Sequence, residues 1–284
     1  MNDIPPVNAA WLLKKYGLRA DKRLGQNYLQ DAGALKNIVD AAEIQKTDTV
    51  LEVGPGLGSL TRYLSVAARQ VVAVELDLKL ITVLQATLKP YSNVRLIRGD
   101  ILGLTPKELE LPSNYIIAAN IPYNITSAII RHLLESEPKP RRIVLTVQKE
   151  VAERICASPP DTSLLALSVQ VYGKPTITAH ISAGAFFPAP KVDSAALRIE
   201  IYPEPLIPHL LLPDFFKLIK AGFSQKRKTL RNSLSAGLNK STSEIESLLA
   251  QAEIDSKRRA ETLSLKEWER LSQISTEAKN HRGV

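Results

Sequence analysis

The hydrophobic positions of the chain follow one pattern up to about residue 201 and a different pattern beyond it. In residues 49–201, short apolar runs rich in valine and isoleucine alternate with stretches of helical period, which is typical of a sheet covered by helices. We predict seven strands, at residues 50–53, 71–75, 94–97, 115–119, 143–147, 165–172 and 195–201. Helix-length connections join the first five, so these strands should run parallel, and the last two should form an antiparallel edge.

Beyond Tyr202 the pattern predicts helices only. A proline-rich stretch, PEPLIPHLLLP, leads into segments of helical period with no further alternating run. Ser241 with Glu244, and Ser264 with Glu267, have the spacing of capping boxes and should each begin a helix. We therefore predict an α/β domain over residues 1–203 and a small all-helical domain over residues 204–284.

Composition narrows the class of protein. The chain has 37 lysines and arginines against 29 acidic residues, a net charge of +8, which suits a polyanionic partner without separating nucleic acid from small anions. A single cysteine, Cys156, cannot form an internal disulfide, and His132, His180, His209 and His281 lack metal-ligand spacing. No run approaches the ~20 apolar residues that span a bilayer. We expect a cytoplasmic protein without a metal or a membrane segment.

A glycine-rich turn follows the first predicted strand. In VLEVGPGLGSL, at residues 50–60, the strand runs into Gly54, Gly56 and Gly58 and then into a helical pattern. Glycines permit a tight turn and close approach of a ligand, and the start of a helix offers free N–H groups. The spacing differs from the G-x-G-x-x-G of dinucleotide sites. A glycine turn without a ligand remains the alternative.

Two acidic residues follow at the ends of the next two predicted strands. Glu75 lies where a carboxylate accepts hydrogen bonds from ribose hydroxyls in nucleotide-binding sheets, and Asp100 could accept one from an adenine amine. Each residue alone is more commonly a solvated loop acid. Since the carboxyl ends of parallel strands share one edge, the two acids and the glycine turn together predict a ligand-binding crevice there.

The fourth predicted strand ends in Asn120-Ile121-Pro122-Tyr123. This turn brings together an amide oxygen, a backbone carbonyl next to a rigid proline, and an aromatic face. Such groups can stack on a flat base and accept both protons of an exocyclic amine. A proline turn with a packed tyrosine is the alternative, which the position at this edge of the sheet disfavours.

With these motifs in place, the chain resembles the ribosomal RNA small-subunit adenine dimethyltransferase family. Its members transfer methyl groups from S-adenosyl-L-methionine to N6 of two adjacent adenosines in the 3′-terminal hairpin of small-subunit (16S) rRNA. Besides the features above, the resemblance rests on LGQNYLQD at residues 24–31, FFPAPKVDS at 186–194, FSQKRKTLRNSL at 223–234 and RAETLS at 259–264. It implies a seven-stranded Rossmann-like methyltransferase domain, with S-adenosyl-L-methionine as cofactor, and a C-terminal all-helical RNA-binding domain.

The resemblance also implies roles for individual residues. Asn120 and the carbonyl of Ile121 would accept from the target amine, while Tyr123 and Phe186 would stack on the base. The residues implied to bind the cofactor are Gln26, Asn27, Leu29, Glu52, Gly54, Gly56, Gly58, Glu75, Leu76, Asp100, Ile101 and Asn120.

Two basic segments are assigned to RNA. A run of lysines and arginines is commonly a solvated face, but beside a base-binding pocket we expect it to bind RNA phosphates. The residues chosen are Lys22, Arg23, Lys226, Arg227, Lys228 and Arg231, and Lys14, Lys15 and Arg19 belong to the first of these segments. We expect small-subunit rRNA within an immature 30S subunit as partner, late in assembly, and a monomeric enzyme.

Two other functions remain open. Large-subunit rRNA adenine methyltransferases of the macrolide-resistance type share the glycine turn, the acids and the asparagine motif, although FSQKRKTLRNSL and RAETLS favour the small-subunit family. A ribosome-assembly or RNA-binding factor could keep the fold without catalysis. The intact set of Glu75, Asp100, Asn120 and Tyr123 favours an enzyme.

Overall fold

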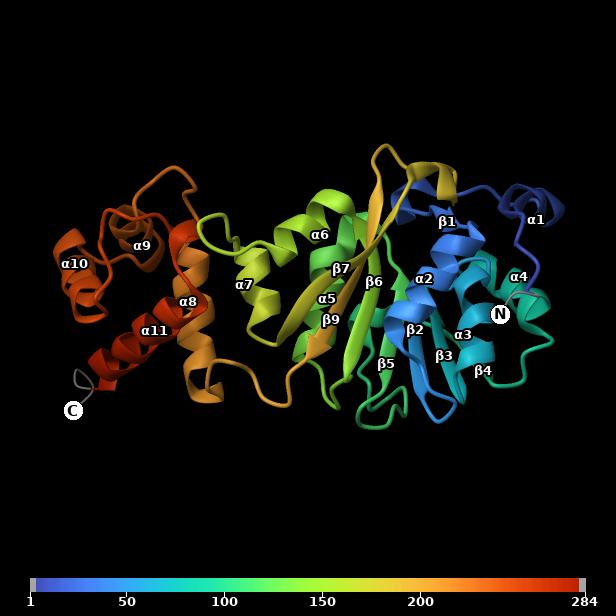
Figure 1. Cartoon of the computed structure of the whole chain (residues 1–284), viewed down its shortest axis with the longest axis horizontal. Helices are drawn as coiled ribbons and strands as arrows, with labels where there is room; N and C mark the ends of the chain where they lie inside the picture. Colours follow the sequence, from blue (N-terminus) through green and yellow to red (C-terminus); the bar gives the residue numbers. More distant parts are fainter. Residues whose placement is uncertain (1–3, 281–284) are drawn as a thin grey trace. The chain divides into compact units, whose positions relative to one another are not determined.

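A computed structural model describes residues 4–280 of the chain (Figure 1). The described chain divides into two compact units, one of residues 4–153 and 174–201 and one of residues 154–173 and 202–280. The division into functional domains after residue 203 stays a prediction. None of the described helices is both long and apolar enough to cross a bilayer.

A seven-stranded sheet forms the centre of the first unit, in the order β4-β3-β2-β5-β6-β9-β7. The strands are β2 (Thr49–Val53), β3 (Gln70–Glu75), β4 (Val94–Arg98), β5 (Ile116–Asn120), β6 (Arg142–Gln148), β7 (Gly173–Ile181) and β9 (Ser194–Ile201). Strands β4, β3, β2, β5 and β6 pair in parallel, and β9 pairs with β6 in the antiparallel sense. The predicted parallel arrangement of the first five strands is confirmed.

The strand order places a switch point in the middle of the sheet. From β2 the chain proceeds outward to β3 and β4, and it then crosses back to β5 on the other side of β2. Val50 of β2 is paired with both Val71 of β3 and Ile116 of β5. Sheets of this kind bind ligands beyond the carboxyl ends of the strands at the point where the order reverses.

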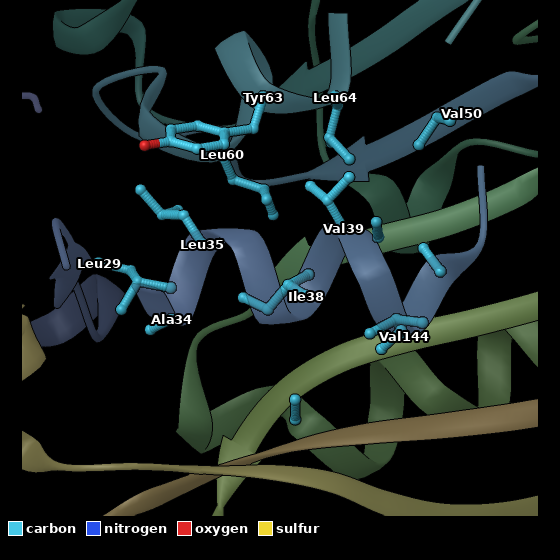
Figure 2. Close-up of a cluster of buried hydrophobic side chains, with 14 of the residues drawn as sticks. Leu29, Ala34, Leu35, Ile38, Val39, Val50, Leu60, Tyr63, Leu64 and Val144 are labelled. Carbon is cyan, nitrogen blue, oxygen red and sulfur yellow. The ribbon is translucent and has the colours of Figure 1, made fainter. Parts of the chain in front are cut away.

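Helices α2 (Ala32–Ala42) and α3 (Ser59–Ala67) pack side by side over one face of the sheet (Figure 2). Their buried side chains meet those of the strands, with Leu35, Ile38, Val39, Leu60, Tyr63 and Leu64 lying over Val50 and Val144. Burial of each such side chain contributes about 1.5–3 kcal/mol. The helices that begin in this unit are α1 (Ala9–Lys15), α2 (Ala32–Ala42), α3 (Ser59–Ala67), α4 (Leu78–Leu88), α5 (Thr126–Glu135) and α6 (Lys149–Cys156).

A separate two-stranded sheet ties the region before α2 to the region before β9. Strand β1 (Tyr28–Leu29) pairs with β8 (Phe186–Phe187) in the antiparallel sense, with Leu29 opposite Phe186. This pairing joins the LGQNYLQD and FFPAPKVDS motifs, which lie far apart in the sequence. The short 3-10 helices of the chain are η1 (Lys22–Leu24), η2 (Ile101–Gly103), η3 (Tyr123–Ile125), η4 (Ala183–Ala185), η5 (His209–Leu211) and η6 (Ala260–Thr262).

The strand predicted at residues 165–172 was wrong. Helix α7 (Leu164–Gln170) occupies this segment, and the strand β7 follows it at once. Ser163 caps α7, since its Oγ accepts a hydrogen bond from the Ala166 amide at 3.0 Å. The segment Leu167-Ser168-Val169-Gln170-Val171 alternates apolar and polar residues as a strand does, yet Ala166, Leu167 and Val169 are buried side chains of a helix, so this short alternation did not identify the element.

Residues 202–280 contain only helices and connections, as predicted. The helices are α8 (Leu212–Gly222), α9 (Leu230–Leu238), α10 (Thr242–Gln251) and α11 (Leu265–Asn280). Both predicted capping boxes are confirmed: Ser241 and Glu244 exchange side-chain to backbone hydrogen bonds, as do Ser264 and Glu267. Trp268 is fully buried and anchors α11 in this unit.

Candidate functional site

A cavity of about 270 Å³ lies in the first unit at the carboxyl ends of β2, β3 and β5. Thirteen of the residues predicted to act on the cofactor or the base line it, namely Gln26, Asn27, Leu29, Glu52, Gly54, Gly56, Glu75, Leu76, Asp100, Ile101, Asn120, Ile121 and Tyr123. Gly58 and Phe186 are not among the lining residues. The sequence motifs therefore converge on one site, with these two exceptions.

The glycine turn between β2 and α3 forms one wall of the cavity. Gly54, Gly56 and Gly58 all have positive φ, at 68°, 61° and 82°, which glycine adopts without steric cost. A Cβ at Gly54 would meet nothing within 4 Å, so the backbone there is open to a ligand. A Cβ at Gly56 would lie 3.0 Å from the Tyr28 ring, so glycine is needed for the two to approach. Gly58 is the N-cap residue of α3 and does not line the cavity.

Glu75 fastens the glycine turn to the end of β3. Its Oε2 accepts a hydrogen bond from the Gly56 amide at 3.0 Å, and its Oε1 accepts one from the Asp77 amide at 2.8 Å. Burial raises the pKa of the Glu75 carboxyl, and the two amides partly oppose that shift. Each carboxylate oxygen can accept a further hydrogen bond. Glu75 can therefore shape the turn and bind ribose hydroxyls at the same time.

Glu52 is a buried carboxyl on the cavity wall. The residue is 1% exposed, and burial raises its pKa to about 8, with the nearby Glu75 acting in the same direction and Thr61 against it. Its Oε2 has no hydrogen-bond partner among the described residues. Buried polar atoms nearly always have a hydrogen-bond partner, so we expect a ligand to donate a hydrogen bond to this oxygen. An ammonium group would both donate to Glu52 and offset its charge.

An apolar section of the cavity lies beside Asp100. Leu76 and Leu102 line it with half-exposed side chains, and Ile101 lines it from a buried position. The Oδ1 of Asp100 accepts from the Leu102 amide at 3.0 Å, so Oδ2 can accept from another donor. These groups suit a flat ring that carries an exocyclic amine. The sequence analysis missed Leu102, although its place directly after Asp100 and Ile101 could have indicated it.

The orientation of Asn120 at the end of β5 is held by the segment before α2. Its Nδ2 donates a hydrogen bond to the backbone carbonyl of Asn27 at 3.0 Å. Because the amide nitrogen is engaged, Oδ1 is the atom left to accept a hydrogen bond in the cavity. The backbone of Ile121, whose side chain is buried, follows directly. Asn120 is therefore set as an acceptor.

Two aromatic residues were predicted to stack on the base, and only one lines the cavity. Tyr123 does, and its hydroxyl shares a 2.6 Å hydrogen bond with Oγ of the fully buried Ser194, while burial raises the pKa of Tyr123. Phe186 is 3% exposed and packs in the cluster around α2. Its stacking role stays a prediction, and it would require the ring to leave its present packing.

Residues 23–29, which precede α2, line the cavity. Gln26 is the centre of this segment: its Nε2 donates to Asp77 Oδ2, and its Oε1 accepts from the Tyr28 hydroxyl and the Asp21 amide, each at 2.8 Å. Gly25 has a φ of 64°, and a Cβ there would lie 3.0 Å from Asn124 Oδ1. The sequence analysis missed Gly25, which allows this segment to approach the asparagine turn closely.

The residues predicted to bind RNA lie in both units. Lys22 and Arg23 are exposed, and Arg23 lines the cavity while pairing with Asp21 at 3.2 Å. The exposed residues 226–228 precede α9, whereas Arg231 is paired with Glu246 at 2.7 Å. Their binding of RNA stays a prediction. Among the described residues no cluster of histidine, cysteine or acidic side chains could hold a metal, and His281 lies outside them.

Comparisons with known proteins agree on one family. The model of the ribosomal RNA adenine dimethylase family matches residues 17–274. A ribosomal RNA small subunit methyltransferase A from Dehalococcoides mccartyi is 47% identical over 273 residues, which cover 95% of this chain and 94% of that protein. The enzyme of the same name from Alkaliphilus metalliredigens is 39% identical over 277 residues, which cover 95% and 96%.

Solved structures extend the comparison to the fold. A dimethyladenosine transferase from Plasmodium falciparum superposes with a TM-score of 0.75 at 25% identity, covering 90% of this chain and 98% of that one. The 23S rRNA methyltransferase ErmE superposes with a TM-score of 0.69 at 28% identity, covering 87% and 99%. Because the family model and the relatives span nearly the whole chain, the protein belongs to the ribosomal RNA adenine dimethylase family.

Proposed function

We propose that this protein transfers methyl groups from S-adenosyl-L-methionine to N6 of two adjacent adenosines in the 3′-terminal hairpin of small-subunit rRNA. Family membership and the relatives called small subunit methyltransferase A support this reaction and this substrate. The observation that carries it is the oriented Asn120, whose free Oδ1 shares one cavity with Tyr123 and Glu75. We expect a monomer that needs no metal and acts in the cytoplasm on the immature 30S subunit.

The residues of the cavity fit the methyl donor. The unsatisfied Oε2 of Glu52 suits the ammonium of its methionine part, and Glu75 suits its ribose. The apolar section with Asp100 suits its adenine, and the open backbone at Gly54 leaves room for close contact. When bound, the donor supplies a methyl group on a sulfonium, which is activated toward displacement by an amine.

Asn120 and Ile121 act on the target amine. Adenine N6 is a poor nucleophile because its lone pair is delocalised into the ring. Hydrogen bonds from N6 to Asn120 Oδ1 and to the Ile121 carbonyl, placed off the plane of the base, favour a more tetrahedral nitrogen. Both acceptors interact more strongly as positive charge develops on that nitrogen, so they stabilise the transition state more than the ground state.

Tyr123 holds the base while this occurs. The target adenosine cannot be reached within a stack and must be turned out into the cavity. Stacking on an aromatic ring contributes on the order of 1–3 kcal/mol per base, which offsets part of the cost of unstacking. The N6 proton becomes acidic after alkylation and can leave to water, so the residues need not include a strong base. A monomethylated amine keeps one proton, which it can donate to one of the two acceptors, and it can undergo a second transfer in the same site.

The test of substrate is labelled methyl transfer to immature small subunits, free 16S rRNA, mature small subunits and large subunits in parallel. We expect two dimethylated adenosines in the small-subunit hairpin by mass mapping. The similarity to ErmE keeps a large-subunit substrate as the second candidate. A modified large-subunit adenosine with an untouched small-subunit hairpin would favour that candidate instead.

Replacement of Asn120 tests the chemistry. We expect Asn120→Ala to lower kcat by about 10²-fold or more, the size of effect seen when one charge-stabilising group is lost, with RNA binding retained. Asn120→Asp keeps an acceptor but loses the Nδ2 donor to the Asn27 carbonyl, so an intermediate rate is expected. Transfer at the wild-type rate by the alanine variant would refute the acceptor role.

A further inference from the structure

A second hollow, of about 410 Å³, lies in the first unit between the segment after α1 and the beginning of α4. It is lined by residues 17–22, Asp77, Lys79 and Leu80. Leu80 also lines the cofactor cavity, so the two spaces are neighbours. The methyl transfer described above assigns no role to this hollow.

The hollow carries unpaired positive charge. Arg19, Lys22 and Lys79 line it with exposed side chains, and within residues 4–280 none of the three forms an ion pair. Its two carboxylates are already engaged. Asp21 pairs with Arg23, and Asp77 accepts from the Lys79 amide at 3.0 Å and from Gln26 Nε2 at 2.8 Å. The donors to Asp77 are neutral groups, so the three cations share the hollow with one carboxylate that has no cationic partner, and they exceed it in number.

The cations come from segments that are distant in the sequence but close in space. Asp21 titrates below its usual pKa chiefly because Arg23 hydrogen-bonds to it, and Lys79 acts on it in the same direction. Lys79, at the start of α4, lines the same hollow as Arg19 and Lys22. A single phosphate could contact cations from both segments.

The neighbouring surface favours nucleic acid over a small free anion. Trp11 of α1 is 56% exposed, and Lys15 Nζ lies 4.9 Å from the centre of its indole ring. From this helix the chain continues past Arg19 and Lys22 to Arg23, which lines the cofactor cavity. Exposed aromatic rings interleaved with cations are typical of surfaces that bind single-stranded nucleic acid.

We infer that this hollow binds a backbone phosphate of the rRNA strand that carries the target adenosine, through Arg19, Lys22 and Lys79. The inference rests on the proposed function. It adds a phosphate contact that holds the RNA strand in place next to the cavity. A phosphate held there would set which nucleotide can reach Asn120. Phosphate contacts of this kind fix register and orientation without reading the base.

The test compares Arg19→Gln and Lys79→Gln with Lys36→Gln. Lys36 lies exposed on α2 in the same unit, and no ion pair of the described chain involves it. Affinity for the rRNA hairpin is measured over salt concentrations from about 50 to about 200 mM. Each of the first two variants should weaken binding about three- to ten-fold and lower the slope of log K against log salt by about 0.7–0.9, as the loss of one phosphate contact predicts.

Two controls separate the inference from its alternatives. Affinity for S-adenosyl-L-methionine should be unchanged in all three variants, which shows that the cofactor cavity is intact. Inorganic phosphate at millimolar concentration and constant ionic strength should not displace the RNA, and displacement would identify a free-phosphate site and overturn the inference. Equal affinity and slope in all three variants would also overturn it. A wild-type protein that methylates no small-subunit rRNA would refute the proposed function itself.

Discussion

At the scale of single residues, Glu52, which we propose to bind the cofactor, also affects stability. Its carboxyl has a pKa of about 8 in the folded chain and of 4.5 when unfolded, chiefly because of burial. Between these values the folded state keeps a proton that the unfolded state has released, so the free energy of unfolding falls as pH rises through this window. Above the window the loss is complete and constant.

We therefore expect Glu52→Gln to stabilise the protein increasingly with pH. The gain in free energy of unfolding should grow by about 3–4 kcal/mol between pH 5 and pH 8, since each unit of pKa shift corresponds to about 1.4 kcal/mol. Urea unfolding of both proteins over this range measures it. Glu75, whose pKa is also raised, is present in both proteins and does not enter the difference to first order.

The same substitution should act in the opposite direction on donor binding. An ammonium group beside Glu52 favours release of its proton and so the charged carboxylate, whereas the glutamine side chain of the Glu52→Gln variant has no charged form. The variant should therefore gain less thermal stability from added S-adenosyl-L-methionine than the wild type. A difference in unfolding free energy that does not change with pH would contradict the protonation of Glu52.

Motifs in the sequence located most of the residues that line the cavity, because a glycine turn and acids at the ends of parallel strands must meet at one edge. The motifs did not predict which of these side chains are buried. Phe186 belongs to a motif of the family, yet its side chain packs in the core because β8 pairs with β1. The unsatisfied oxygen of Glu52 and the contact between Asn120 and Asn27 also depend on tertiary structure that no local pattern encodes.

At the scale of elements, the fit between residues 23–29 and the asparagine turn depends on Gly25. An alanine there would carry a Cβ 3.0 Å from Asn124 Oδ1 and 3.2 Å from Pro122 Cβ. We expect Gly25→Ala to push this segment away from the turn and to weaken donor affinity about ten-fold, as measured by calorimetric titration.

Gly17→Ala is the matched control for this prediction. Gly17 has a similar φ of 66°, but a Cβ there would meet nothing within 4 Å. Both variants should lose about 1 kcal/mol of stability through backbone strain. Only Gly25→Ala should change donor affinity, so an equal loss in both variants would assign the effect to strain instead of to the contact.

Helices and strands could be predicted where the period of the apolar residues agreed with the residues that mark the ends of an element. Amphipathic helices join most of the parallel strands, although the connection from β4 to β5 holds only the short η2, and the two capping boxes mark helix starts directly. The prediction for residues 165–172 was wrong because their short apolar and polar alternation favours a strand, whereas the chain forms a helix there. Its buried face is set by packing in the second unit, where Tyr172 lies 6.2 Å from the ring of Phe216.

At the scale of the whole molecule, the excess positive charge is divided between segments with different availability. Residues 226–228 are exposed between α8 and α9, while Arg231 is already paired with Glu246. In the first unit, the cations around η1 lie at the cofactor cavity and at the adjacent hollow. Net charge alone could not show this division, because it does not reveal which cations have partners.

The exposed cations between α8 and α9 are tested together in one triple variant, Lys226→Gln with Arg227→Gln and Lys228→Gln. We expect this variant to weaken affinity for rRNA about 10- to 100-fold and to reduce its salt dependence, since it removes up to three phosphate contacts. Donor affinity should not change, because the cavity lies wholly in the first unit. Filter binding and donor titration measure the two quantities.

Lys240→Gln with Lys257→Gln serves as the control within the same unit. Both lysines are exposed and lie outside the segment between α8 and α9. If this control weakens RNA binding as much as the triple variant does, the unit contributes a diffuse positive field instead of a local contact.

The pairing of β1 with β8 also bears on how the protein is made. The sheet from β2 to β6 is encoded before residue 149, whereas the partner of β1 is encoded only at residues 186–187. A chain emerging from the ribosome can form the glycine turn early, but the segment that orients Asn120 stays without its strand partner until most of the chain has been translated. Because such distant contacts form late, the enzyme should become able to hold its methyl donor only after residue 187 of the 284 has been translated.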